Sequence, residues 1–177
     1  MNKSILILLG SPRKNGNSEV LSDALAKGAQ SVGHTIEKIY IQDNNIKPCT
    51  ACYGCRTTNK CVLNDDMETI LNKMIKADII VLATPVYFYS MSAQMKTLID
   101  RTLPRYTEIK NKDFYFIATA ADGKETMKRT MDSLRGFTDC LPNSRVVKTI
   151  YGDGLYDKGD AKKSSLITKL FETGKNI

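Results

Sequence analysis

The sequence has 177 residues, of which 42% are hydrophobic and 25% charged, a balance that predicts one globular domain over residues 1–177. It contains a single histidine, His34, which argues against metal sites built from several imidazoles and against a Ser-His-Asp triad. The net charge is +7, but no stretch gathers the basic residues with aromatic ones, so we expect anionic small-molecule ligands and no nucleic-acid partner.

The apolar runs of the chain are short. The N-terminal run, Ile5–Leu9, is too short for a signal peptide, and no small-residue cleavage site follows it. Other runs, such as Ile79–Ala83, fall far short of the roughly 20 residues that a membrane span requires. We therefore expect a cytoplasmic protein without a membrane partner. Its five cysteines are then expected as thiols or metal ligands rather than as disulfides.

Five short segments rich in isoleucine, leucine, valine or aromatic residues predict β-strands. The first and third are continuous aliphatic runs, which are typical of strands buried on both faces of a sheet. The five predicted strands are Ser4–Leu9, Ile36–Ile41, Asp78–Thr84, Phe114–Ala120 and Arg145–Ile150.

Apolar residues at helical spacing predict five helices that alternate with these strands. The predicted helices are Ser18–Ser31, Met67–Lys76, Ala93–Leu103, Glu125–Phe137 and Leu166–Lys175. Strands alternating with helices form βαβ units, and right-handed crossovers then give an α/β fold, a three-layer α/β/α sandwich around a five-stranded parallel sheet. Ligands bind such sheets at the carboxyl ends of the strands, here in the loops after the first, third and fourth strands.

The loop after the first predicted strand has the composition of a phosphate site. Its glycines allow close approach of the backbone, its polar side chains donate hydrogen bonds, and the following helix adds free N–H groups. The residues with these properties are Gly10, Ser11, Arg13, Gly16, Asn17 and Ser18. The spacing matches neither the dinucleotide fingerprint nor the P-loop, so a monophosphate fits better. The alternative is an ordinary turn in which Asn17 or Ser18 caps the helix.

Four cysteines lie close together between the second predicted strand and the second predicted helix. They are Cys49, Cys52, Cys55 and Cys61. A Cys-x2-Cys-x2-Cys spacing is how a chain wraps one face of a [4Fe–4S] cluster, and the fourth cysteine could close the site. The same spacing allows zinc, reduced thiols or a redox disulfide, so the residues alone leave these alternatives open.

Three adjacent aromatic residues, Tyr87, Phe88 and Tyr89, follow the third predicted strand. Aromatic rings in such a loop can stack on a planar ligand, while the backbone N–H groups face the edge of its ring. The alternative is a subunit interface or a local loop core. Together with a phosphate site on the neighbouring strand, this loop favours a planar ring attached to a phosphate.

These segments resemble the flavodoxin-like NAD(P)H-dependent FMN reductases, particularly their iron–sulfur flavoprotein branch. The segments that carry the resemblance are Gly10-Ser11-Pro12-Arg13 with Asn17-Ser18, Asp65-Asp66-Met67, Thr84-Pro85-Val86-Tyr87, and Lys96 with Asp100-Arg101, and they span most of the chain. The resemblance implies a sheet in the order 2-1-3-4-5, bound FMN, NAD(P)H as co-substrate, and a homodimer or homotetramer. The loop Thr119–Gly123 is poorer in glycine than in many relatives. The cofactor-binding residues that we expect are Ser11, Arg13, Asn15, Gly16, Asn17, Ser18, Pro85, Val86, Tyr87, Phe88, Thr119 and Ala120.

Two functions follow from these observations. The leading hypothesis is an FMN-dependent oxidoreductase that passes reducing equivalents from NAD(P)H to a small acceptor, such as a free flavin or a quinone. The flavin carries that chemistry, so no catalytic acid or base side chain is expected. The alternative is an electron-transfer iron–sulfur flavoprotein, in which a ferredoxin-like donor reduces FMN through a [4Fe–4S] cluster at the four cysteines.

Overall fold

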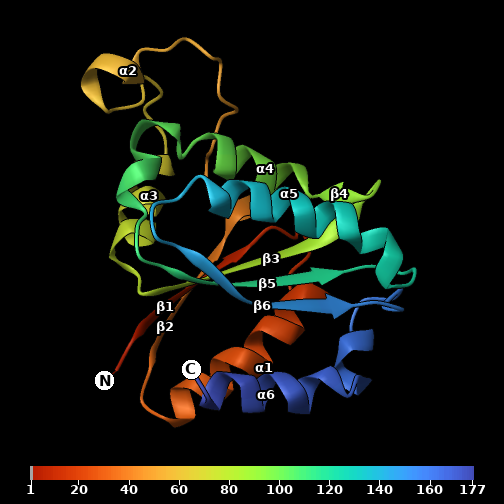
Figure 1. Ribbon diagram of the computed structural model, residues 1–177. Helices are drawn as coiled ribbons and strands as arrows, with labels where there is room; N and C mark the ends of the chain where they lie inside the picture. Colours follow the sequence, from red (N-terminus) through yellow and green to blue (C-terminus); the bar gives the residue numbers. More distant parts are fainter. Residues whose placement is uncertain (1) are drawn as a thin grey trace.

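The computed structural model describes residues 2–177, so residue 1 of the predicted domain lies outside the described part. A central sheet carries helices on both of its faces (Figure 1). The strands are β1 (Ser4–Leu9), β2 (Thr35–Tyr40), β3 (Ile79–Tyr87), β4 (Ser90–Met91), β5 (Asp113–Thr119) and β6 (Arg145–Gly152). The α-helices are α1 (Asn17–Ser31), α2 (Cys55–Thr58), α3 (Met67–Lys76), α4 (Ala93–Asp100), α5 (Lys128–Asp139) and α6 (Leu166–Lys175).

The sheet topology is the predicted one. The five long strands are parallel and lie in the order β2-β1-β3-β5-β6, which is 2-1-3-4-5 once the two-residue strand β4 is left out. In the centre of the sheet, Leu8 of β1 lies opposite Ile39 of β2 and Leu82 of β3. The strand order reverses between β1 and β3, so the loops after these two strands diverge at the point where ligands bind such folds.

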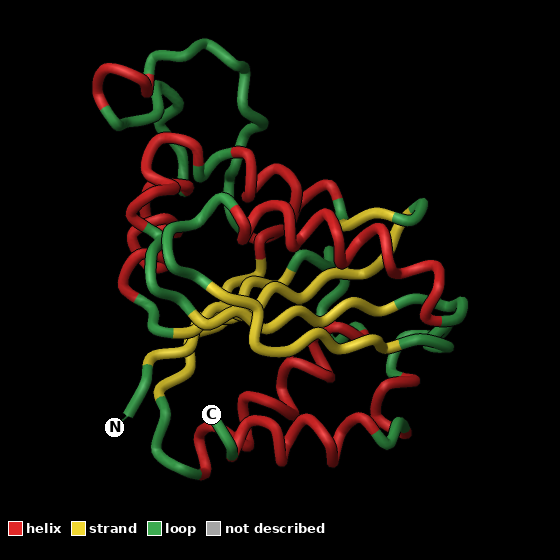
Figure 2. The backbone as a smooth tube through the Cα atoms, in the orientation of Figure 1, coloured by secondary structure: helices red, strands yellow, loops and turns green. Residues whose placement is uncertain are grey.

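Side chains of the central strands alternate between two apolar layers. Leu6 and Leu8 of β1 pack in the layer that contains α3, α4 and α5, whereas Ile5 and Ile7 pack in the layer that contains α1 and α6. Figure 2 shows these helices on opposite sides of the sheet. Because β1 and the first part of β3 are buried on both faces, their sequences are almost entirely aliphatic, and β1 has its predicted bounds.

The structure differs from the predicted elements at several ends. Strand β3 continues to Tyr87 because β4 folds back on it and pairs antiparallel. Helix α4 ends at Asp100, three residues before the predicted end, and a 3₁₀ segment, Leu103–Glu108, follows with Pro104 near its start. Helix α5 is preceded by another 3₁₀ turn, Lys124–Met127. The short helix α2 lies inside the segment that had been expected as a loop.

In the part of the chain that the structure describes, the helices are too short or too polar to cross a lipid bilayer.

Candidate functional site

The carboxyl ends of the parallel strands meet around one pocket of about 400 Å³. Backbone hydrogen bonds bring the loops together, from Gly10 N to the Ala83 carbonyl at 2.8 Å and from Ala120 N to the Gly152 carbonyl at 3.0 Å. A larger groove of about 830 Å³ lies along β6 and α6, but none of the residues predicted to bind a ligand lines it. The smaller pocket is therefore the candidate site.

Ten of the twelve predicted cofactor-binding residues line this pocket. They are Ser11, Arg13, Gly16, Asn17, Ser18, Pro85, Val86, Tyr87, Thr119 and Ala120. The other two, Asn15 and Phe88, lie next to lining residues without lining the pocket themselves. The pocket has a wall that sequence reasoning missed, formed by Ala121 and by Leu155–Lys158 of the loop after β6.

The turn after β1 forms one side of the pocket. Ser11 Oγ accepts a hydrogen bond from Arg13 N at 3.1 Å, which folds the chain back toward α1. A methyl group at Gly16 would lie 3.1 Å from the Arg13 carbonyl oxygen, so the close turn favours glycine there. Helix α1 begins directly afterwards; its first two residues, Asn17 and Ser18, line the pocket, and the N–H groups of a first helical turn have no partner within the helix.

Two polar groups at this turn are left without protein partners. Ser18 Oγ is buried and makes no hydrogen bond, an arrangement that costs free energy unless a ligand or water fills it. The exposed Arg13 lines the pocket and forms no ion pair with any acidic residue among positions 2–177. A hydroxyl, a guanidinium and a helix N-terminus together match the donor set that a phosphate monoester needs, so the residues present fit such a group.

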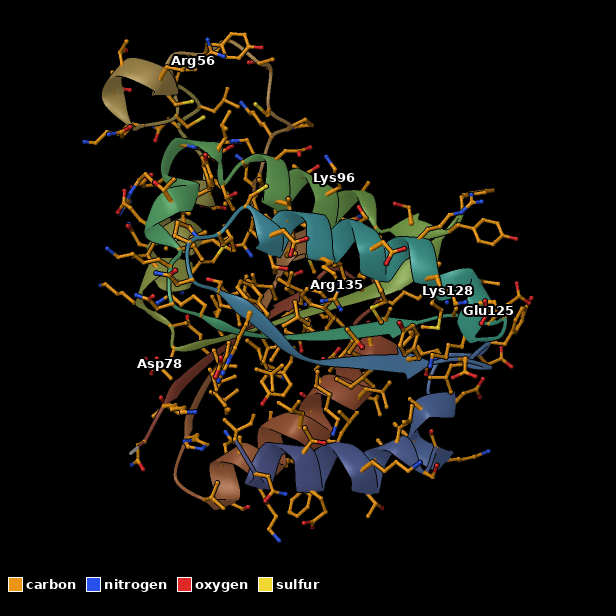
Figure 3. All side chains as sticks on the ribbon, in the orientation of Figure 1. Arg56, Asp78, Lys96, Glu125, Lys128 and Arg135 are labelled. Carbon is orange, nitrogen blue, oxygen red and sulfur yellow. The ribbon has the colours of Figure 1, made fainter. Side chains whose placement is uncertain are left out.

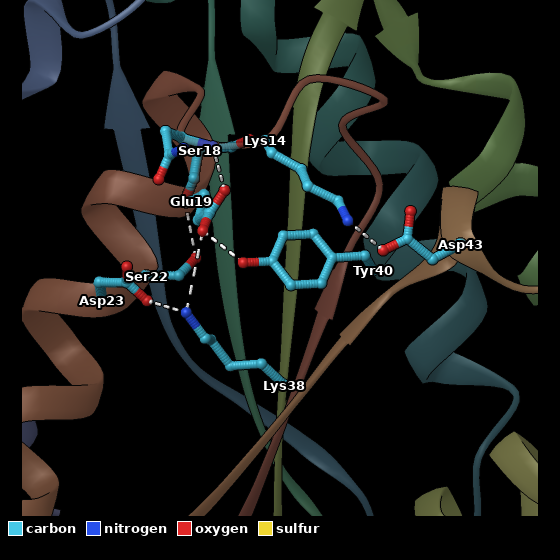
Figure 4. A network of polar contacts seen from close by, with 9 residues as sticks. Lys14, Ser18, Glu19, Ser22, Asp23, Lys38, Tyr40 and Asp43 are labelled. Atoms are coloured by element: carbon cyan, nitrogen blue, oxygen red, sulfur yellow. Dashed lines mark hydrogen bonds and ion pairs between the residues drawn. The ribbon is translucent and has the colours of Figure 1, made fainter.

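A buried carboxylate, that of Glu19, holds the turn after β1 through a hydrogen bond (Figure 4). Glu19 is only 4% exposed, and its two oxygens accept hydrogen bonds from the Asn15 N–H and from the Tyr40 hydroxyl. Asn15 has a φ of 55°, a left-handed conformation that this hydrogen bond helps to hold. The bond to Glu19, together with burial, raises the pKa of Tyr40, so the hydroxyl remains a donor. Lys38 of β2 lies 3.8 Å from Glu19 and partly balances its charge.

The β3–β4 hairpin forms the opposite side of the pocket. Tyr87 pairs with Ser90, and the two residues between them, Phe88 and Tyr89, have φ values of 48° and 62°. Positive φ at both positions is typical of a type I′ turn, which normally carries glycine or asparagine, so two aromatic residues there are strained. Phe88 is fully exposed, whereas Pro85, Val86 and Tyr87 face the pocket with an apolar surface.

The cysteine loop, the segment from Cys49 to Cys61, lies beside the C-terminal end of α4 and projects from the body of the molecule (Figure 1). Figure 3 shows Arg56 on this projecting loop, where its guanidinium carbon lies 3.9 Å from the centre of the Tyr53 ring. All four predicted metal ligands, Cys49, Cys52, Cys55 and Cys61, line one small pocket and are free thiols.

Among residues 2–177, no three histidine, cysteine or acidic side chains lie close enough together to coordinate one metal ion. In this conformation the four cysteines therefore do not form a metal-binding site. Hydrogen bonds from the backbone of Gly54 and from the Thr50 side chain lower the pKa of Cys52, so this thiol forms a thiolate more readily than its ordinary pKa implies.

Sequence comparison identifies related proteins. The profile of the family described as NADPH-dependent FMN reductase matches residues 4–149. An iron–sulfur flavoprotein of Archaeoglobus fulgidus is 42% identical over 97 residues, which cover 55% of this chain and 44% of that relative. An iron–sulfur flavoprotein of Methanocaldococcus jannaschii is 33% identical over 135 residues, or 75% of this chain and 70% of the relative. The chain thus aligns with less than half the length of the first relative.

Solved structures share the fold. An NAD(P)H:quinone oxidoreductase from Methanothermobacter marburgensis superposes with a TM-score of 0.76 and 15% identity, covering 99% of this chain and 96% of that one. An FMN-dependent NADH-azoreductase from Bacillus anthracis, solved with FMN, superposes with a TM-score of 0.73 and 15% identity, covering 99% of both chains. At this level of identity the likeness concerns the fold alone.

Proposed function

This chain belongs to the NADPH-dependent FMN reductase family, and on that basis we propose that it is an FMN-dependent oxidoreductase that passes reducing equivalents from NAD(P)H to a small acceptor such as a flavin or a quinone. One observation carries the proposal. The same pocket has unpartnered phosphate-type donors, Arg13 and Ser18, on one side and the apolar segment Pro85–Tyr87 on the other. That division suits a ligand with a phosphate at one end and a flat ring at the other.

The residues of the pocket divide into two binding roles. Ser11, Arg13, Ser18 and the first N–H groups of α1 would hold the phosphate, and Pro85–Tyr87 with Thr119–Ala121 would hold the ring. Bound FMN supplies the electron-transfer chemistry, so the protein needs to bind and orient the reactants without an acid or base of its own.

The exposed hairpin supports a second part of the proposal, a homodimer or homotetramer. Phe88 and Tyr89 are large, exposed and strained, a combination that costs stability in an isolated chain. Contact with another subunit near the pocket would bury these rings.

Anaerobic rapid mixing tests the proposed activity. The protein is loaded with FMN and mixed with NADPH or NADH while the visible absorbance of the flavin is followed. We expect at least one nicotinamide to bleach the flavin within seconds, and a quinone or free flavin added afterwards to restore the absorbance. An FMN-loaded protein that neither nicotinamide reduces would refute this function.

A second candidate function is an iron–sulfur flavoprotein that receives electrons from a ferredoxin-like donor. It is favoured by the shared pocket of the four cysteines and by the names of the two sequence relatives. The loop would have to close for three or more thiols to reach one metal centre. Iron and acid-labile sulfide are measured after anaerobic preparation, with Cys52→Ala as the control. About four irons per chain, lost in the variant, would support this function, and no iron in either protein would exclude it.

A further inference from the structure

The side chain of Asn17 is tied to a distant loop. Its Nδ2 donates to the carbonyl oxygens of Leu155 at 3.4 Å and Asp157 at 2.9 Å, and its Oδ1 accepts from the N–H groups of Gly159 at 3.0 Å and Ala161 at 3.1 Å. A carboxamide has two donor hydrogens and two acceptor lone pairs. These four bonds use all of them, so the Asn17 side chain has no hydrogen bond left for a phosphate.

The loop that Asn17 holds, residues 153–161, forms the wall of the pocket that the sequence did not predict. Glycines with positive φ, Gly154 at 68° and Gly159 at 98°, lie on either side of the lining residues Leu155–Lys158. The start of the loop is also held by hydrogen bonds from Gly154 N to the Asp122 carbonyl and from Leu155 N to the Ala120 carbonyl.

Between its first residues and the buried Ala161, the loop is linked to the rest of the protein mainly through Asn17. The remaining backbone hydrogen bonds of residues 157–162 join residues of the loop and of the 3₁₀ turn Asp160–Lys163 to one another. Among positions 2–177, the hydrogen bonds that link this part of the loop to the rest of the protein are therefore those to Asn17. Ala161 at the end of the loop is buried in the core with residues of α1 and α6, so we expect loss of the Asn17 bonds to loosen the segment 156–160 between the two anchored ends of the loop.

We infer that Asn17 is a positioning residue, which holds the loop 153–161 in place as a wall against the flavin ring system, with Tyr156 as its main contact. The inference rests on the proposed FMN site. Tyr156 lines the pocket while its side chain is 79% exposed, so its ring is available to pack on a bound aromatic system.

Comparison of FMN with riboflavin separates this role from phosphate binding, because riboflavin lacks the phosphate. We expect Asn17→Ala to weaken both ligands by the same factor, roughly tenfold, because either ligand must then order the loop when it binds. Tyr156→Ala leaves the tether intact and should weaken both ligands between about twofold and tenfold. A matched control is Asn44→Ala, which removes another amide, bonded to the Tyr40 carbonyl at 2.8 Å, away from the pocket.

Amide hydrogen exchange of the flavin-free proteins supplies a readout that does not depend on any ligand. In Asn17→Ala we expect faster exchange at residues 157–161 and unchanged exchange at Leu155 and in β1 and β3, whereas Asn44→Ala and Tyr156→Ala should leave the loop protected. The inference is overturned if Asn17→Ala loses FMN affinity but keeps riboflavin affinity, or if the loop stays protected. If the wild-type protein binds no flavin, the proposed function fails and the flavin-wall role fails with it, while hydrogen exchange still decides whether Asn17 holds the loop.

Discussion

Arg101 forms a bidentate ion pair with Asp65: Nη1 donates to Oδ2 at 2.7 Å and Nη2 donates to Oδ1 at 2.9 Å. Both side chains are 1% exposed. Arg101 also donates to the carbonyl of Lys47 at 2.6 Å, and Asp65 accepts hydrogen bonds from Lys47 N and Met67 N. Lys47 and Asp65 lie on either side of the four cysteines in the sequence. The ion pair therefore fastens both ends of the cysteine loop to the end of α4.

Breaking this pair should destabilise the protein strongly. Asp65→Asn leaves the Arg101 guanidinium buried without a counter-charge, and such losses cost about 3–5 kcal/mol. The free energy of unfolding in urea at pH 7 measures the effect. Asp100→Asn is the control, because its pair with Lys96 is exposed and worth only about 0.3–0.5 kcal/mol. Equal losses in the two variants would contradict the role given to the buried pair.

The stability supplied by Asp65 should disappear in acid. Burial by itself raises the pKa of Asp65, but hydrogen bonds from Arg101 and from the backbone outweigh it and hold the pKa below its usual range. Because the folded pKa is below the unfolded one, this stability is fully present above about pH 4 and is lost as the pH falls through the folded pKa. The difference in the free energy of unfolding between wild type and Asp65→Asn should be constant from roughly pH 5 to 7 and should decrease below pH 4. If this difference already decreases near pH 6, a group other than Asp65 causes the effect.

Removal of the Glu19 carboxylate should make the turn after β1, residues 11–16, less rigid. Glu19→Ala leaves the Asn15 N–H and the Tyr40 hydroxyl without their acceptor, and we expect FMN affinity to fall about tenfold. Glu19→Gln keeps one acceptor oxygen and should lose less. FMN titration measures both, with Glu37→Ala, from an exposed pair with Lys73, as the control. If Glu19→Ala binds FMN as tightly as the control, the turn does not depend on this carboxylate.

The two sequence-predicted aromatic contacts should behave differently. Tyr87 lines the pocket, so Tyr87→Ala should weaken FMN by about 0.5–1.5 kcal/mol through lost ring packing. Phe88 points into solvent and does not line the pocket, so Phe88→Ala should leave FMN affinity unchanged in a single chain. Fluorescence titration at low protein concentration makes the comparison. A larger loss for Phe88→Ala would mean that another subunit brings this ring to the flavin.

The fold and most of the pocket could be predicted because they depend on local patterns. Helices α3 and α6 begin and end at the predicted residues, since apolar spacing and the flanking residues define their limits. Ser11 and Arg13 closely follow β1, and Pro85–Tyr87 form the end of β3. Both strands have clear aliphatic runs, so the topology predicts that these residues lie at the carboxyl edge of the sheet.

The remaining features depend on contacts between distant parts of the chain. The hydrogen-bond partners of the Asn17 side chain lie between Leu155 and Ala161, which is 138 to 144 positions further along the sequence. No local sequence pattern therefore indicates that all hydrogen bonds of this amide are used. The loop that it holds did carry a signal, in the glycines at 152, 154 and 159 after the fifth predicted strand, which sequence reasoning did not weigh. The end of α4 was placed three residues too late: Arg101 keeps a helical backbone, but a 3₁₀ segment with Pro104 near its start follows, and proline disfavours helical backbone in the residue before it.

Calorimetric titration of FMN and riboflavin into the flavin-free protein and its Arg13→Ala variant tests the central claim, that one pocket holds a phosphate and a flat ring. We predict one FMN per chain and weaker riboflavin binding in the wild type. In Arg13→Ala we predict a loss of about 1.5–3 kcal/mol for FMN, the worth of a charge-assisted hydrogen bond, with riboflavin unchanged. No flavin binding by the wild type, or an FMN affinity that Arg13→Ala leaves unchanged, would contradict the account.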